Sequence, residues 1–141
     1  MPVQKLRVND IELAYRIDGA GVDAPWLVFS HSLACDHSMW DPQLEAFGDF
    51  RLLRFDTRGH GSSSAPAGEY TMEGLAGDAL ALLDALGIRR CHFVGLSMGG
   101  MIGQQLALRA PARLRSLTLA DTSSRYPAAA RPMWDERIAL V

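Results

Sequence analysis

The sequence predicts an α/β fold in which a mostly parallel sheet carries helices on both faces. Three observations support this prediction: four short apolar runs typical of buried strands, helical patterns between them, and an alternating N-terminal segment. A chain of 141 residues that is 48% hydrophobic can bury one core. With 14 basic and 16 acidic residues it has no basic stripe for nucleic acid, and no apolar run reaches membrane-spanning length.

The chain is expected to open with an antiparallel hairpin over residues 4–19, with the turn-prone pair Asn9-Asp10 at its tip. Alternate residues of the second strand are apolar and share one face: Ile11, Leu13, Tyr15 and Ile17. The four apolar runs follow as strands of the kind that is covered on both faces. They are Trp26–Ser30, Arg51–Phe55, Cys91–Gly95 and Leu114–Ala120.

Two helices are predicted between these strands. The first follows Thr71, a suitable N-cap, and ends at Gly87, which suits the C′ position. The second follows Ser97 and stops at Pro111, because proline cannot continue a helix. We expect residues 1–124 to form the N-terminal part of a larger core whose C-terminal strands lie outside this sequence. Residues 125–141 are expected to begin a helical lid.

Ser97 lies between an expected strand and an expected helix, in the pattern Gly95-Leu96-Ser97-Met98-Gly99. This is the G-x-S-x-G pattern of a nucleophile elbow, in which a strained turn presents the serine hydroxyl. Glycine at 95 and 99 avoids collisions with the neighbouring strand and helix, and the helix N-terminus favours developing negative charge. A glycine-rich packing turn is the alternative. The pattern is not a dinucleotide-binding loop, since serine stands where G-x-G-x-x-G has its second glycine.

Two further loops agree with a nucleophile at Ser97. The stretch His31-Ser32-Leu33 begins where the first buried strand ends, which is where the second oxyanion donor of such sites is found. We therefore predict that the backbone N–H groups of Leu33 and Met98 form an oxyanion hole. The stretch "DTRGHGSS" is interpreted as a structural turn that Arg58 and His60 fix.

The stretches "HSLACDHSMWDPQL", "RFDTRGHGSS" and "GLSMGG" together resemble the α/β-hydrolase superfamily, and within it the 3-oxoadipate enol-lactonases of aromatic catabolism. The resemblance implies a serine hydrolase of a small carboxylic ester or lactone that uses no metal and no organic cofactor. A cofactor-free perhydrolase or C–C hydrolase stays open as an alternative, as does a non-catalytic ligand-binding relative. The two cysteines form no CxxC pattern and the N-terminus has no apolar signal segment, so we expect a cytoplasmic location.

In this superfamily the triad runs Ser, Asp or Glu, then His. None of the four histidines is placed to activate Ser97, so the triad histidine is expected beyond residue 141 and the chain is expected to be close to inactive alone. Asp121 is a candidate for the acid, or else a carboxylate that caps a turn. Trp40 and Trp134 are candidate pocket walls, or else core residues. The incomplete sheet also favours self-association.

Overall fold

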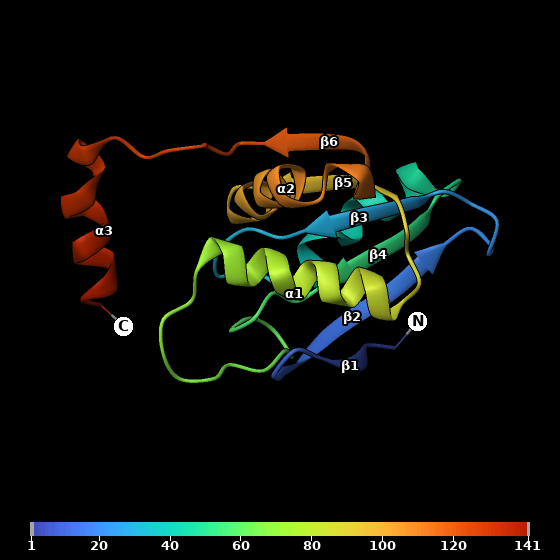
Figure 1. Cartoon of the computed structure of the whole chain (residues 1–141), viewed down its shortest axis with the longest axis horizontal. Helices are drawn as coiled ribbons and strands as arrows, with labels where there is room; N and C mark the ends of the chain where they lie inside the picture. The colour runs from blue at the N-terminus through green and yellow to red at the C-terminus, as the bar shows by residue number, and fades with distance from the viewer. Residues whose placement is uncertain (1, 141) are drawn as a thin grey trace.

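The computed structural model describes residues 2–140 (Figure 1). Over these residues one six-stranded sheet forms, in the order β1-β2-β4-β3-β5-β6. The strands are β1 (Gln4–Val8), β2 (Ile11–Gly19), β3 (Trp26–Ser30), β4 (Arg51–Phe55), β5 (Cys91–Leu96) and β6 (Leu114–Ala120). β1, β2 and β4 pair antiparallel, whereas β4, β3, β5 and β6 run parallel to one another. The predicted hairpin and mostly parallel sheet are confirmed.

Helices cover both faces of the sheet. α1 (Met72–Ala85) and α2 (Met98–Arg109) pack with Val28, Leu53 and Phe93 into the larger core cluster. The 3-10 segment η1 (His37–Phe47) packs Trp40 against Phe29 in the smaller cluster on the other face. Because successive side chains of a strand point to opposite faces, β3 contributes Val28 to one core and Phe29 to the other.

The two long helices begin and end where the sequence predicts. The hydroxyl of Thr71 accepts a hydrogen bond from the Gly74 N–H at 3.0 Å, which satisfies one free amide of the first turn of α1. Gly87 follows the last turn at φ +69°, a left-handed conformation that costs glycine little. α2 ends at Arg109, and the short η2 (Pro111–Arg113) then leads into β6.

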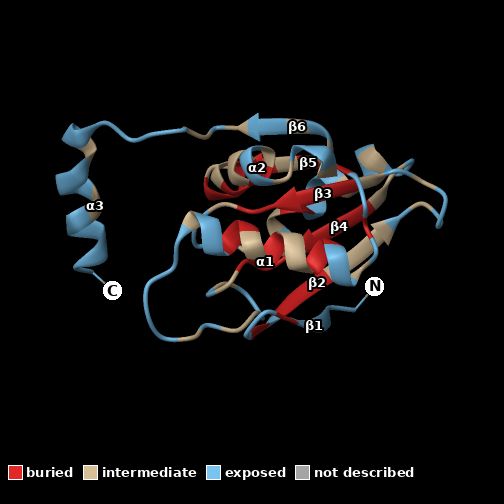
Figure 2. Ribbon diagram, viewed as in Figure 1, coloured by how far each residue is buried: buried red, intermediate tan, exposed pale blue. Residues whose placement is uncertain are grey.

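β6 differs from the expectation of a strand covered on both faces. None of its residues is buried, and Leu119 is 44% exposed (Figure 2). The physical reason is its place in the sheet, since β6 is an edge strand that pairs with β5 alone among the described residues. An apolar run indicates a buried strand only when the strand also has a neighbouring strand along each of its two edges.

β4 contains a fully buried arginine inside an otherwise apolar run. Arg54 pairs with Asp18 at 2.6 Å and with Asp41, and it also donates to the His37 carbonyl. Burial would raise the pKa of Asp18, but the hydrogen bond and charge of Arg54 lower it below the ordinary value. Ion pairing therefore allows a guanidinium to occupy a core position.

The chain continues past β6 into η3 (Ala128–Ala130) and α3 (Arg131–Ile138). Figure 1 shows α3 set apart from the sheet, beyond the ends of β6 and α2, and Figure 2 shows it mostly exposed. A helix is thus present where a lid was expected to begin. None of the helices within residues 2–140 is long and apolar enough to cross a membrane.

Candidate active site

Ser97 occupies a sharp turn between β5 and α2. Its backbone adopts φ +53° and ψ −113°, a region that side-chain-bearing residues rarely enter. The Ser97 N–H donates to the Ala120 carbonyl at 2.9 Å, so the end of β6 anchors the turn. Positive φ at a serine, between a buried strand and a helix, is the backbone geometry predicted for a nucleophile elbow.

The glycines on each side of Ser97 are required by close backbone approach. A Cβ at Gly95 would lie within 3.0 Å of backbone atoms of Gly99 and Gly100. A Cβ at Gly99 would lie within 3.0 Å of the carbonyl oxygens of Ser30 and His31. These contacts are with main chain, which cannot rotate away, so a larger residue at either position would force the elbow apart.

A cavity of about 300 Å³ opens beside Ser97. Its lining consists of Leu33, Met72, Ser97, Met98, Met101, Tyr126 and Trp134. The fold therefore brings Ser97, both predicted oxyanion residues and Trp134 to one space, although they come from three separate segments of the chain. The Tyr126 and Trp134 rings pack edge to face with centroids 5.3 Å apart, and they form the wall on the α3 side.

Trp40, the other predicted pocket wall, lies elsewhere. It is 7% exposed and packs against Phe29 with ring centroids 4.8 Å apart, under η1. It does not line the cavity beside Ser97. The physical reason is that η1 covers the opposite face of the sheet from α1 and α2, so Trp40 takes the core position that the sequence left open as its alternative.

The loop that carries Leu33 is held by His31, which is fully buried. Its Nε2 accepts a hydrogen bond from the Thr57 N–H at 2.9 Å, and its Nδ1 lies 2.8 Å from the Ser32 carbonyl oxygen. These partners require a neutral ring protonated at Nδ1. Burial lowers the pKa of His31, which favours the same neutral form.

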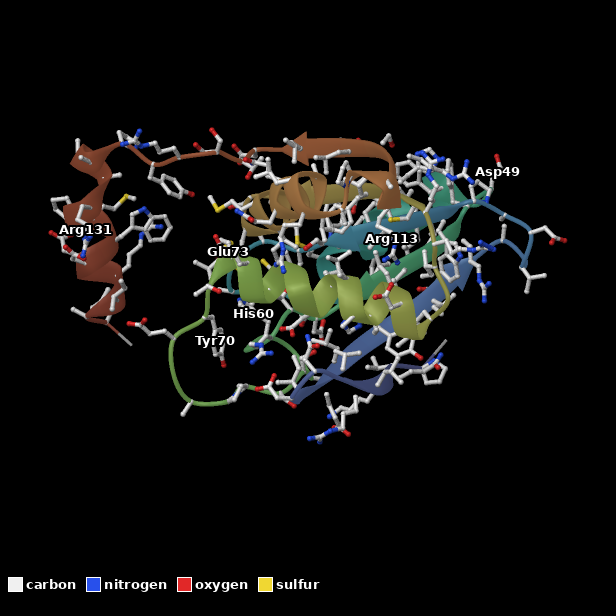
Figure 3. The ribbon with its side chains drawn as sticks, in the orientation of Figure 1. Asp49, His60, Tyr70, Glu73, Arg113 and Arg131 are labelled. Atoms are coloured by element: carbon white, nitrogen blue, oxygen red, sulfur yellow. The ribbon has the colours of Figure 1, made fainter. Side chains whose placement is uncertain are left out.

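The turn after β4 is structural, as predicted from the sequence. Arg58 donates to both carboxylate oxygens of Asp78 on α1, at 2.7 and 2.9 Å, and to Asp10 in the hairpin turn at 2.7 Å. These hydrogen bonds raise the pKa of Arg58. The His60 ring lies 3.1 Å from the Arg58 carbonyl oxygen, and Figure 3 shows His60 close to Tyr70 in the segment that leads into α1.

Within residues 2–140, no histidine bonds to Ser97. His31 and His60 hold loops, His37 pairs with the buried Asp56 at 2.7 Å, and His92 lies 2.8 Å from the Ser116 hydroxyl. Asp36, His37 and Asp56 could together hold a metal ion by spacing, but the His37–Asp56 hydrogen bond already uses two of their ligand atoms.

Asp121 directly follows β6, in an exposed position with φ +44°. Its neighbour Ala120 bonds to Ser97, so the chain does bring Asp121 beside the elbow. Its role as triad acid stays a prediction. The next residue, Thr122, was not singled out from the sequence, yet its hydroxyl donates to the Ser97 carbonyl oxygen at 2.7 Å. A threonine after an expected strand carries no motif, so no signal in the sequence pointed to this contact.

Comparisons with known proteins agree with this geometry. Residues 25–141 match the family model of the alpha/beta hydrolase fold. The chain is 41% identical over 137 residues to 3-oxoadipate enol-lactonase 2 of Acinetobacter baylyi. The aligned region covers 96% of this chain and 50% of the relative. A crystal structure of a hydrolase from Pseudomonas aeruginosa superposes with a TM-score of 0.91 at 51% identity, covering 98% of this chain and 52% of that one.

A crystal structure of the enol-lactonase from Burkholderia xenovorans gives a TM-score of 0.83 at 52% identity, covering 86% of this chain and 48% of that one. The chain thus spans about half the length of the relatives that it matches. The strained Ser97 turn, the sheet order and the match over residues 25–141 lead to one conclusion. The chain belongs to the α/β-hydrolase family.

Proposed function

We propose that Ser97 is the nucleophile of a serine hydrolase that acts on small carboxylic esters or lactones. One observation carries this proposal: Ser97 sits at positive φ between two obligatory glycines and lines a cavity that Leu33 and Met98 also line. A residue needed only for packing would gain nothing from such strain, whereas an exposed nucleophile needs it.

The proposed reaction uses groups of this chain for attack and for charge stabilisation. Ser97 Oγ adds to the substrate carbonyl, and its proton passes to a base. The N–H groups of Leu33 and Met98 donate to the resulting oxyanion, and the α2 N-terminus adds its positive dipole. Collapse of this intermediate breaks the ester C–O bond and leaves an acyl-enzyme, while the base gives its proton to the departing alkoxide or enolate oxygen. Water then attacks the acyl-enzyme and releases the carboxylic acid.

Enol-lactone hydrolysis is the specific activity that we infer, most closely that of 3-oxoadipate enol-lactone. Support comes from the names of two relatives, the Acinetobacter and Burkholderia enol-lactonases, at 41% and 52% identity. The cavity of about 300 Å³ matches a small substrate. Residues 125–141 would contribute a lid, because Tyr126 and Trp134 already form one wall of the cavity.

The base for Ser97 is the part that residues 2–140 do not supply, since each described histidine bonds elsewhere. Oxyanion donors and binding alone give roughly 10³–10⁴-fold acceleration over water, and an intact triad adds about 10⁶-fold in the best-studied case. We therefore propose that the 141-residue chain alone turns over esters slowly. A cytoplasmic location stays a prediction, compatible with the two free thiols of Cys35 and Cys91.

The proposal is tested by hydrolysis of enol-lactone, γ-butyrolactone and p-nitrophenyl acetate by the chain and by Ser97→Ala. Added imidazole supplies a base, with buffer of equal imidazole content as blank. We expect imidazole to increase the Ser97-dependent rate, with enol-lactone the best substrate. If Ser97→Ala leaves the rate of hydrolysis unchanged, Ser97 is not the nucleophile. If the rate depends on Ser97 but shows no preference for the enol-lactone, only the assignment of the substrate is wrong.

A further inference from the structure

The backbone of Ser97 is held at both of its polar groups by one short segment. Its N–H donates to the carbonyl of Ala120, and its carbonyl accepts from the hydroxyl of Thr122 at 2.7 Å. The Thr122 side chain also fills the space beside Gly100, where a Cβ would come within 2.6 Å of the Thr122 methyl. The end of β6 and the residues just after it therefore hold the elbow from one side.

The carbonyl of Ser97 and the N–H of Met98 belong to the same peptide unit. That unit is planar and trans, so the two groups point in opposite directions. A hydrogen bond that fixes the direction of the carbonyl therefore also fixes the direction of the N–H. The Met98 N–H is one of the first amides of α2, which have no acceptor within the helix, and Met98 lines the cavity beside Ser97.

We propose that Thr122 is a positioning residue that aims the Met98 N–H at the oxyanion. Its hydroxyl holds the Ser97 carbonyl, and through the shared peptide plane it sets where the donor on the other side points. The Ser97 carbonyl also accepts from the Met101 N–H at 3.1 Å. Two donors on one carbonyl polarise the peptide and strengthen its N–H as a donor. The catalytic meaning of this contact rests on the proposed function, but the contact itself does not.

The hydroxyl is needed for this role and the methyl group is not, which separates positioning from packing. Thr122→Val keeps the shape and removes the donor, whereas Thr122→Ser keeps the donor and removes the methyl. Thr118→Val is the matched control, because Thr118 is an exposed threonine of β6 whose hydroxyl makes no hydrogen bond to another group within residues 2–140. Should Thr122→Val fold poorly, Thr122→Ala removes the same hydroxyl without filling the space.

The first measurement is amide NMR on the 141-residue chain, which needs no activity. In Thr122→Val the Ser97 N–H keeps its own acceptor at Ala120, but the segment that holds it loses the hydrogen bond from Thr122. We therefore expect exchange of the Ser97 amide to rise about 2- to 10-fold, the factor that one hydrogen bond contributes to local stability. The Met98 amide resonance should shift, while exchange at Ile102 and Leu106 in the middle of α2 stays unchanged. Thr122→Ser and Thr118→Val should match wild type. Equal acceleration at all amides, or none at Ser97, would overturn the proposal.

The second measurement is the Ser97-dependent hydrolysis of p-nitrophenyl acetate with imidazole. Removing an oxyanion donor outright costs about 10²–10³-fold in kcat, so misaiming one should cost roughly 10-fold in kcat with KM nearly unchanged. Thr122→Ser should restore kcat. If kcat falls in Thr122→Ser but not in Thr122→Val, the methyl group matters through packing, and the proposed positioning role of the Thr122 hydroxyl is refuted. If Ser97→Ala shows that the rate does not depend on Ser97, the proposed function fails, and the NMR result alone decides whether Thr122 positions the peptide.

Discussion

Replacing Gly99 by alanine should destabilise the fold, although alanine is the better helix former. Gly99 lies in the first turn of α2, and a Cβ there would come within 3.0 Å of the Ser30 and His31 carbonyl oxygens at the end of β3. Overpacking of this kind costs about 1–3 kcal/mol, and contact with main chain argues for the upper end. For a domain of this size each kcal/mol shifts Tm by about 3 °C. We therefore expect Gly99→Ala to lower Tm by about 10 °C.

The matched control is Gly77→Ala in α1. Its Cβ would have one neighbour, Arg109 Nη1 at 4.0 Å, which is ordinary contact. The helix gains about 0.5–1 kcal/mol from alanine at such a position, so Tm should rise by about 2–3 °C. Thermal unfolding followed by circular dichroism compares the two variants with wild type. A Tm for Gly99→Ala at or above that of wild type would refute the close approach between α2 and β3.

Three more outcomes are expected. The free energy of unfolding, measured by urea titration, should fall as the pH drops below about 6.5. The reason is that the pKa of His31 is lowered in the folded state, so the unfolded chain binds the proton more readily. If the same pH dependence persists in His31→Gln, another group causes it. Arg54→Met should cost about 3 kcal/mol in the same titration, since it breaks the ion pair that the buried Arg54 guanidinium makes with Asp18, and a loss below about 1 kcal/mol would contradict this. Sedimentation should show self-association through β6 that Leu119→Lys weakens; a monomer at all concentrations would disprove it.

The sequence predicts those parts of the fold that follow from local pattern. Alternation and apolar runs located all six strands, because side-chain period and burial are written into consecutive residues. Thr71 and Gly87 marked the bounds of α1 for the same reason, since caps act within one turn. Strand pairing order and the exposure of β6 depend on which elements meet in space. The local sequence pattern predicts neither the pairing order nor the exposure of β6, so β6 was expected to be covered on both faces.

The candidate site divides in the same way. Ser97 and its glycines form a contiguous motif, and the structure brings Leu33, Met98 and Trp134 to the cavity beside it. Trp40 could be placed only once the face covered by η1 was known, because an aromatic residue looks alike in a core and in a pocket. The hydrogen bond from Thr122 joins residues 25 positions apart and is accepted by a backbone carbonyl. Because every residue has such a carbonyl, the residue types at the two positions do not predict this contact.

The most direct test of the nucleophile at Ser97 is to locate the adduct that a fluorophosphonate forms on this chain, by peptide mass spectrometry, with and without imidazole as base. If Ser97 is the nucleophile, one peptide is modified, with the phosphonate on Ser97, at a rate that rises with imidazole concentration, and Ser97→Ala forms no such adduct. Modification of other serines at the same rate, or an unmodified Ser97 at saturating imidazole, would contradict it.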